Sequence, residues 1–259
     1  MKNIKFSIIT VCFNSEATIE RTLISVQKQN YSNVEHVIID GGSKDSTLAI
    51  IKKHRKSIAY FVSEPDKGIY DAMNKGVAAA KGDVLLFLNS DDSLVDNDVL
   101  TDVANQYEED SATDVVYGDV IYTSPRYEKY RKQSNKSATR WGLAKKIVQH
   151  QTLFVKKQTF LDSGGYDLKY RIIADYDWEL KLFILMRCKY QYIPTPIAYV
   201  QRGGESSKFS TTVDRLDVMQ KVFSPLEIII FYRMRKFFRK KILTPSVRVL
   251  VLVRNLFRL

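Results

Sequence analysis

Short apolar runs alternate with segments of helical periodicity over residues 1–110. The runs are rich in β-branched and aromatic residues and end at turn residues, a pattern that predicts buried strands. Between them, apolar residues recur three or four positions apart, which predicts amphipathic helices. Because parallel strands need crossover connections, usually helices, this alternation indicates an α/β fold with a mostly parallel sheet. The predicted strands span residues 6–12, 35–39, 58–62 and 84–88, and the predicted helices lie around 19–26, 48–51 and 69–80.

The pattern is less regular after the fourth predicted strand. Helical spacing recurs over residues 97–107 and 175–186. A polar, charged excursion over residues 124–137 is compatible with a mobile flap and with a solvated hairpin. Apolar runs predict further strands over residues 114–122, 151–155, 190–193 and 197–200.

Polar residues follow the end of each of the first four predicted strands. In open α/β sheets, ligands bind outside the carboxyl ends of the strands, so these polar ends predict one ligand-binding crevice. Neither G-x-G-x-x-G nor G-x-x-x-x-G-K-[ST] follows the first strand, which argues against a dinucleotide dehydrogenase and a P-loop NTPase. The four polar ends are residues 10–14, Asp40, residues 64–66 and residues 89–92.

Two adjacent carboxylates, Asp91 and Asp92, follow the apolar run of residues 84–88. Neighbouring negative charges repel each other unless a cation lies close to them. Mg²⁺ and Mn²⁺ bind carboxylates together with substrate phosphate oxygens, so this pair predicts a metal site. The alternative is that these residues cap the helix predicted from Asn97.

Composition adds two constraints. A chain of 259 residues with 45% hydrophobic content can form one large domain with an appendage. Its two cysteines, Cys12 and Cys188, form no disulfide framework and no zinc motif, which suits a reducing compartment. The apolar stretch after Lys5 has no small-residue cleavage site, so we interpret it as the first strand and not as a signal peptide.

The formal charge of +11 is concentrated at the C-terminal end. From Pro225 onward, nine Lys or Arg residues stand against one acid, Glu227, so this tail carries +8 and residues 1–224 carry +3. Its apolar runs are shorter than the ~20 residues that span a bilayer. Basic, aromatic-rich helices bind membrane interfaces, which we expect of residues 225–259. Packing onto the body as a basic helix pair is the alternative. Nucleic-acid binding is disfavoured because no recognised module accompanies the charge.

Four motifs occur in order and resemble those of one enzyme family. They are SIITVCFN at 7–14, IIDGGSKD at 38–45, SEPDKGIYDAMNKG at 63–76 and FLNSDD at 87–92. With these motifs, residues 4–207 resemble the family 2 glycosyltransferases, in particular the bacterial enzymes that build colanic acid, capsule and O-antigen repeat units. The resemblance implies the GT-A fold, a nucleotide-sugar donor, Mg²⁺ or Mn²⁺, and inversion at the anomeric carbon.

The resemblance also implies roles for individual residues. Thr10, Val11 and Asn14 line the nucleotide pocket, and Asp40 accepts the base N–H. Asp66 and Lys67 lie near the nucleoside or the pyrophosphate. In the acidic motif Asn89 stands where the family usually has Asp. Ser90 and Asp91 complete the donor contacts, and Asp91 and Asp92 carry the metal.

On the acceptor side, the usual Glu-Asp motif of the family is Ala174-Asp175 here, so Asp175 takes the role of catalytic base and Asp177 is the fallback. His150 either contacts the acceptor or the diphosphate, or is structural. Trp178 is a core residue or a sugar platform. The other two histidines, His36 and His54, are expected at the surface.

These expectations describe an inverting enzyme that moves a sugar, a hexosyl or N-acetylhexosaminyl group, to a polyprenyl-diphosphate-linked saccharide. The donor half would be residues 1–110, the acceptor half 111–224, and the tail would hold the cytoplasmic enzyme on the inner face of the membrane. The Gly203-Gly204 loop and the Tyr127 region are candidates for closing the site. The alternatives are a metal-dependent nucleotidyltransferase and an inactive, membrane-docked assembly factor.

Overall fold

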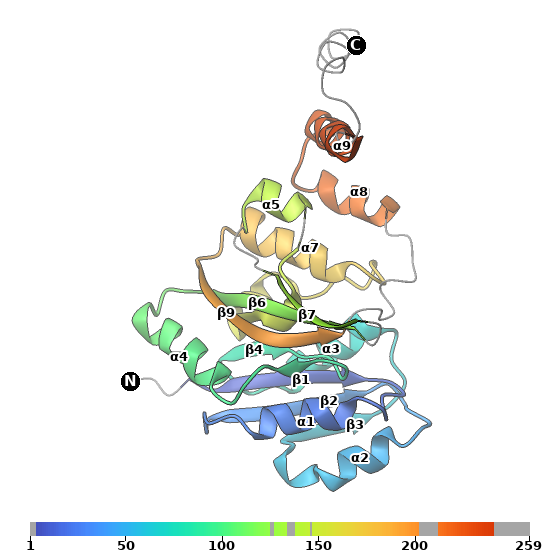
Figure 1. Ribbon diagram of the computed structural model, residues 1–259, viewed down its shortest axis with the longest axis vertical. Helices are drawn as coiled ribbons and strands as arrows, with labels where there is room; N and C mark the ends of the chain where they lie inside the picture. Colours follow the sequence, from blue (N-terminus) through green and yellow to red (C-terminus); the bar gives the residue numbers. More distant parts are fainter. Residues whose placement is uncertain (1–3, 125–126, 134–137, 146, 202–211, 241–259) are drawn as a thin grey trace. The chain divides into compact units, whose positions relative to one another are not determined.

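The computed structural model describes residues 4–124, 127–133, 138–145, 147–201 and 212–240 (Figure 1). They divide into two units, the first ending at Asp214 and the second beginning at Arg215. None of the helices in these ranges combines the length and the apolar character that a bilayer crossing requires. The Gly203-Gly204 loop and the last part of the basic tail, residues 241–259, lie outside the described residues.

The first half forms the parallel sheet that the sequence predicts. The strand order β3-β2-β1-β4 places β1 between β2 and β4, and all three pairings are parallel. The strands are β1 (Phe6–Cys12), β2 (Val34–Asp40), β3 (Tyr60–Ser63) and β4 (Val84–Phe87). The helices that connect them are α1 (Ile19–Gln27), α2 (Thr47–Lys53) and α3 (Ile69–Ala79), and a short 3₁₀ turn η1 (Arg55–Ser57) precedes β3.

The second half extends this sheet to nine strands within the described residues. Beyond β4 the order continues β8-β6-β9-β5, and β7 also pairs with β6. Only β6 and β9 are parallel here, and the other pairings are antiparallel. The strands are β5 (Ser93–Leu94), β6 (Val115–Ser124), β7 (Tyr127–Gln133), β8 (Leu153–Lys156) and β9 (Tyr190–Gln201). The result is a mixed α/β fold of the GT-A type.

Several elements differ from the prediction. The two strands expected around Pro194 and Pro196 are one strand, β9, because register shifts opposite Asp119 absorb the prolines. The helix expected over residues 175–186 changes to a π-helix at Lys181. β7 pairs antiparallel with β6, as the hairpin alternative proposed. The remaining elements are α4 (Val99–Glu109), α5 (Arg140–Lys145), η2 (His150–Thr152), α6 (Lys157–Asp162), α7 (Ala174–Leu180), η3 (Lys181–Leu185), α8 (Thr212–Gln220) and α9 (Pro225–Lys240).

The core explains why the first strands are apolar along their whole length. Every residue of β1 is buried, because helices cover both faces of the sheet. Phe6 and Ile8 point into a cluster with α1 and α4, whereas Ile9 approaches Gly76 of α3 on the opposite face. A side chain at position 76 would overlap Ile9, so the glycine lets α3 pack directly on the sheet.

The histidine of β2 corrects the expectation of a surface residue. His36 is only 2% exposed, because β2 lies between β1 and β3 under α1 and α2. Its Nε2 lies 2.9 Å from the hydroxyl oxygen of Thr10 on β1. Burial lowers the pKa of His36 to about 3, so the imidazole stays neutral in the folded protein at physiological pH.

We therefore expect stability to fall on acidification through His36. The unfolded chain binds a proton near pH 6.5 and the folded chain does not, so stability is lost as the pH falls from about 6.5 towards 3. Between pH 7.5 and 5.5 this amounts to about 1.4 kcal/mol. Urea unfolding of His36→Gln should show a pH dependence smaller by this amount. Thr10→Val, which keeps the buried imidazole, should retain the wild-type slope. Equal slopes for wild type and His36→Gln would contradict this account.

Candidate active site

The carboxyl ends of the four parallel strands meet at one edge of the sheet. In the register, Cys12 lies opposite Asp40, and Asp40 lies opposite Ser63. The chain leaves β1 towards β2 on one side, whereas β4 pairs on the other side, so the switch in strand order falls beside β1. This is where open α/β sheets bind ligands. The topology thus produces the crevice that the polar strand ends predict.

Asp40 organises the loop that follows β2. Its Oδ2 accepts hydrogen bonds from the N–H groups of Gly42 and Ser43, at 3.0 and 2.9 Å, and from the Ser63 hydroxyl at 2.6 Å. Its Oδ1 accepts from the Ser43 hydroxyl and from the Cys12 thiol. Burial alone would raise the pKa of Asp40, but these donors lower it below the usual range. The carboxylate is 0% exposed, so it is not open to the base N–H that the resemblance assigns to it, and its contacts shape the loop.

Two more accessible side chains lie over this loop. The Phe13 ring is 60% exposed directly after β1, and the Asp66 Oδ1 accepts a hydrogen bond from the Gly68 N–H at 2.8 Å. A Cβ on Gly41 would stand 2.6 Å from Asp66 Oδ2 and 3.5 Å from the Phe13 ring. Gly41 therefore lies beneath both, and a side chain at this position would push the Asp66 carboxylate aside. Phe13 was missed in the sequence because it reads as the end of an apolar run, although an aromatic residue past a strand end was its signal.

The other residues assigned to the nucleotide pocket divide into two groups. Thr10 and Val11 are buried in β1 and support the crevice from beneath. Asn14 adopts a positive φ of 48° after the strand, and its Oδ1 accepts a hydrogen bond from the Lys44 N–H at 2.8 Å. Lys67 is exposed in the loop before α3, and its N–H donates to Asp71. Asn14 and Lys67 thus lie at the edge of the crevice, in the loops that follow β1 and β3.

The two carboxylates after β4 have different surroundings. Asp92 is 1% exposed, and its two oxygens accept from the Gln151 side chain at 2.9 Å and from the Gln201 N–H at 3.0 Å. Burial and the neighbouring Asp91 raise the pKa of Asp92 well above its usual range. Asp91 is only partly buried, and burial also raises the pKa of its carboxyl group. Asp92 therefore ties the acidic loop to the rest of the fold, whereas Asp91 stays accessible.

The helix-cap interpretation of this pair is wrong, because α4 begins six residues later, at the N-cap Asp98. The acidic loop is held instead by α1. The Thr22 hydroxyl donates to the carbonyl oxygens of Ser90 and Asp92, at 3.0 and 2.6 Å, and Arg21 donates to the carbonyl of Asp91 at 2.6 Å. The Ser90 hydroxyl lies 2.8 Å from that of Ser15, which precedes α1.

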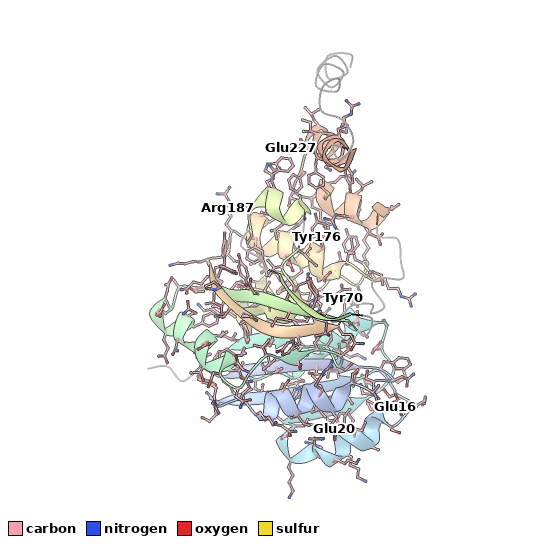
Figure 2. The ribbon with its side chains drawn as sticks, viewed as in Figure 1. Glu16, Glu20, Tyr70, Tyr176, Arg187 and Glu227 are labelled. Carbon is pink, nitrogen blue, oxygen red and sulfur yellow. The ribbon has the colours of Figure 1, made fainter. Side chains whose placement is uncertain are left out.

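Asp175 lies on the opposite side of the crevice, in the first turn of α7. Its Oδ1 accepts a hydrogen bond from the Tyr70 hydroxyl at 3.0 Å, and its Oδ2 lies 3.4 Å from Nδ1 of His150. Nε2 of His150 lies 3.3 Å from the amide nitrogen of Asn89. Tyr70, at the start of α3, is labelled in Figure 2. The structure thus brings Asp175, His150 and Asn89 into one chain of contacts. Asn89 lies in the acidic loop, two positions before Asp91.

Asp177 and Trp178 face away from this cluster, because two or three helical positions turn a side chain by about 200–300°. Asp177 is 1% exposed and forms an ion pair with Lys181 at 2.8 Å. Trp178 is fully buried, and its indole N–H donates to the Ser163 hydroxyl at 2.9 Å. The core alternative for Trp178 is thus what the structure contains, and neither residue is open to an acceptor.

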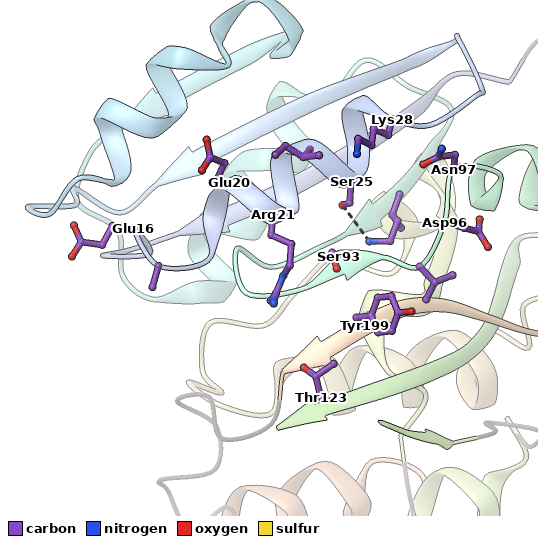
Figure 3. A pocket seen from close by; sticks show the side chains of 14 residues that line it. Glu16, Glu20, Arg21, Ser25, Lys28, Ser93, Asp96, Asn97, Thr123 and Tyr199 are labelled. Atoms are coloured by element: carbon purple, nitrogen blue, oxygen red, sulfur yellow. Dashed lines mark hydrogen bonds between the residues drawn. The ribbon is translucent and has the colours of Figure 1, made fainter. Parts of the chain in front are cut away.

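A separate cavity of about 750 Å³ lies on the outer side of α1 (Figure 3). It is bounded by α1, β5 and β9, and its lining includes Arg21, Ser25 and Tyr199. The Ser25 hydroxyl accepts the dashed hydrogen bond, from the Leu94 N–H at 3.2 Å. Asp40, Asp91 and Asp175 do not line this cavity. Arg21 links it to the crevice through the carbonyl of Asp91.

Comparison with known proteins identifies the family. A model of the family described as "Glycosyl transferase family 2" matches residues 7–167. The chain belongs to glycosyltransferase family 2. A "PGL/p-HBAD biosynthesis glycosyltransferase" from Mycobacterium tuberculosis is 35% identical over 222 residues, which cover 81% of each chain. An "Uncharacterized glycosyltransferase" from Haemophilus influenzae is 27% identical, over 79% of this chain and 71% of that protein.

Solved structures confirm the GT-A fold of this transferase. S. aureus TarS 1-349 in complex with UDP-GlcNAc superposes with a TM-score of 0.70 at 20% identity, over 85% of this chain and 65% of that one. The chain thus spans slightly less than two thirds of that protein fragment. The mannosyltransferase PcManGT from Pyrobaculum calidifontis, in complex with GDP-Man and Mn²⁺, gives a TM-score of 0.61 at 16% identity, over 78% of this chain and 58% of that one.

GT-A enzymes commonly use a divalent metal. The acidic loop offers carboxylate oxygens, which are the ligands that such a metal prefers. The described residues contain no cluster of three or more His, Cys, Asp or Glu side chains with metal-binding geometry. Mg²⁺ and Mn²⁺ are often held by only one or two carboxylates together with substrate phosphates. Asp91, accessible at the crevice, matches this arrangement. Asp92 is buried, and each of its oxygens already accepts one hydrogen bond, so it is less open to a metal than Asp91.

We expect Asp40→Asn to destabilise the transferase by at least about 3 kcal/mol. The amide would turn a donor towards several N–H and O–H groups, and hydrogen bonds to a charged group are worth about 1.5–3 kcal/mol each. Urea unfolding measures the loss. Asp162→Asn, at an exposed position of α6, is the matched control and should change stability by less than about 0.5 kcal/mol. Near-wild-type stability of Asp40→Asn would show that the loop does not depend on the carboxylate.

Proposed function

We propose that the protein is an inverting glycosyltransferase that moves a sugar from a nucleoside-diphosphate sugar to a hydroxyl group of a lipid-linked saccharide. The observation that carries this proposal is the contact chain Asn89–His150–Asp175. It joins the acidic loop after β4, on the donor side, to a carboxylate at the start of α7, on the opposite side. Displacement at an anomeric carbon needs these two kinds of group on either side of the sugar ring.

On the donor side, the crevice suits a nucleotide. Phe13 offers an exposed aromatic ring for stacking a base, next to Asp66, which can accept from the base or ribose. Lys67 and the N-terminal end of α3 supply positive charge for the diphosphate. A UDP-sugar is the preferred donor in this proposal, supported by the likeness to TarS, whose structures contain UDP-GlcNAc and UDP. The transferred group is a hexosyl or N-acetylhexosaminyl residue.

Asp91 would hold the divalent metal, and Asp92 would fix the loop that presents it. When bound, Mg²⁺ or Mn²⁺ supplies positive charge to the diphosphate leaving group. Asn89 and Ser90 stand beside Asp91 in the same loop, where they can contact the ribose or the sugar. The hydrogen bonds from Thr22 and Arg21 keep this loop in place without using the Asp91 carboxylate.

Asp175 acts as the general base. Its carboxylate takes the proton from the acceptor hydroxyl, whose oxygen attacks the anomeric carbon as the bond to the nucleoside diphosphate breaks. One displacement from the face opposite the leaving group inverts the anomeric configuration. Because the transition state resembles an oxocarbenium ion, nearby carboxylates also stabilise its charge. An assembly factor without activity would not need Asp175 to be held by Tyr70 and His150, which favours the enzyme.

The acceptor and the location rest on α9 and on the relatives. Leu226 and Ile229 of α9 are 54% and 43% exposed, and with the exposed Arg233 they lie on one face, at helical spacing. An exposed apolar face next to basic residues suits an anionic membrane surface. We therefore place the enzyme in the cytoplasm, peripheral on the inner face of the membrane, with a polyprenyl-diphosphate-linked acceptor in surface polysaccharide synthesis. The mycobacterial relative is named for PGL/p-HBAD biosynthesis, so a different lipid acceptor is the alternative.

Two substitutions test the catalytic roles. Asp175→Asn should lower transfer by roughly 10²–10⁴-fold and leave donor binding unchanged, because only the base is lost. Asp91→Asn should weaken Mn²⁺-dependent donor binding and lower transfer at least about 100-fold. A panel of nucleotide sugars, with and without Mn²⁺, identifies the donor by thermal shift, and transfer is then assayed with it. Asp162→Asn is the control. Full activity of both site variants would contradict the proposal.

Membrane binding is tested separately. Replacing Leu226 and Ile229 together by Ser should weaken binding to anionic phospholipid vesicles at least about tenfold, because two apolar side chains no longer enter the interface. Sedimentation with vesicles of phosphatidylglycerol and phosphatidylcholine measures this. Val213→Ser, at a position 79% exposed on α8, should bind like wild type. Equal binding of all three proteins would remove the exposed face of α9 as the membrane contact.

A further inference from the structure

The position of His150 follows from the pairing of β4 with β8. These strands are antiparallel, with Val84 opposite Lys156 and Leu85 opposite Val155. β4 ends at Phe87 and β8 begins at Leu153, directly after the 3₁₀ turn η2. The segment that leads into β8 therefore lies beside the acidic loop that leaves β4. As a result, Gln151 reaches Asp92, and His150 is placed between Asn89 and Asp175.

Both ring nitrogens of His150 have a contact. The contact of Nε2 determines whether Nδ1 carries a proton. The Asn89 amide nitrogen, 3.3 Å from Nε2, can only donate, so Nε2 of the ring accepts. A neutral imidazole with a bare Nε2 carries its proton on Nδ1, and Nδ1 lies 3.4 Å from Oδ2 of Asp175. The side chains of His150 and Asp175 are only 12% and 13% exposed, so little water competes for these contacts.

We propose that His150 is a positioning residue for the transfer reaction, and that Asn89 selects its Nδ1–H tautomer so that the ring donates to Asp175. The proposal rests on the assignment of Asp175 as the general base. His150 does not touch the reacting atoms in this scheme. It acts on the reaction through the orientation of the carboxylate.

The surroundings of Asp175 show what this orientation achieves. A carboxylate offers about four acceptor positions. Oδ1 accepts the Tyr176 N–H at 2.8 Å and lies 3.0 Å from the Tyr70 hydroxyl, which also donates to the Ile172 carbonyl oxygen at 2.7 Å. Oδ2 lies 3.4 Å from Nδ1 of His150. Burial and Asp175 raise the pKa of Tyr70 well above its usual value, so its hydroxyl stays a donor. One position on Oδ2 remains for the acceptor hydroxyl, and a base held in one orientation avoids the cost of ordering it at each turnover.

This arrangement gives a physical reason for Asn89 at a position where the resemblance predicts Asp. A carboxylate at position 89 would need a proton from Nε2. The neutral ring would then present its bare Nδ1 to the Asp175 carboxylate, and only a second proton on the ring would keep that contact attractive. With Asn89, the amide nitrogen Nδ2 holds the ring and the neutral ring suffices for the contact with Asp175.

The tautomer can be measured without turnover. The chain has three histidines, so long-range ¹H–¹⁵N spectra of the full-length protein contain three imidazole patterns, and His150→Ala assigns the one in question. We expect an Nδ1–H pattern for wild-type His150, and a proton on Nε2 in Asn89→Asp. An Nε2–H tautomer in the wild type would overturn the proposal, as would an unchanged pattern in Asn89→Asp. Neither result depends on whether the protein transfers sugar.

Kinetics test the consequence. His150→Ala should lower kcat by roughly 10–100-fold while the donor Kd and the melting temperature stay close to wild type. Asn89→Asp should lower kcat as well, and the double variant should be no worse than His150→Ala, because both act through one contact chain. His54→Ala, which removes a histidine of α2's C-terminal end, is the matched control and should keep full activity. An unchanged kcat in His150→Ala, or a loss explained by donor affinity alone, would overturn the positioning role. If the wild-type protein shows no sugar transfer, that result would count against the proposed function and not against the role of His150.

Discussion

The antiparallel pairing of β4 with β8 is the constraint on which the site depends. β4 belongs to the parallel half and delivers the acidic loop, whereas β8 belongs to the mixed half and is preceded by His150 and Gln151. Because the strands run in opposite directions, the end of one lies beside the beginning of the other. A shift in this register would move the segment that carries His150 and Gln151 along β4 and separate it from Asn89 and Asp92.

The two carboxylates of the acidic loop, Asp91 and Asp92, have different roles because they are buried to different extents. Asp92 is enclosed and satisfied by Gln151 and by the last residue of β9, so it joins three segments of the sheet. That contact holds the loop, and Asp91 is thereby left at the crevice without having to stabilise the fold. Asp40 repeats the principle after β2, where a buried carboxylate gathers the N–H groups of a tight turn. The accessible contacts there are Phe13 and Asp66.

Much of the first half was predictable from the sequence. The apolar run of β1 and the helical spacing of α3 are local patterns, and the structure reproduces both to within a residue. The same holds for the convergence of the four strand ends, because parallel strands leave no other arrangement. In the second half, β5 has two residues and α5 and α6 have six each, which is too short for a periodic signal. The prediction of two strands, over residues 190–193 and 197–200, was wrong, because a bulge lets one strand continue through Pro194 and Pro196.

The sequence by itself determined the fold class, the family and the chemical nature of the site, because these depend on local periodicity and on motifs of adjacent residues. Only the tertiary structure decided the direction in which each side chain points. It buried His36 and Trp178, enclosed Asp40 and Asp92, and left Phe13 and Asp91 accessible. The contact between His150 and Asp175 also belongs to this level. The physical reason is that burial and hydrogen-bond partners come from strands and helices distant in sequence, so no local pattern encodes them.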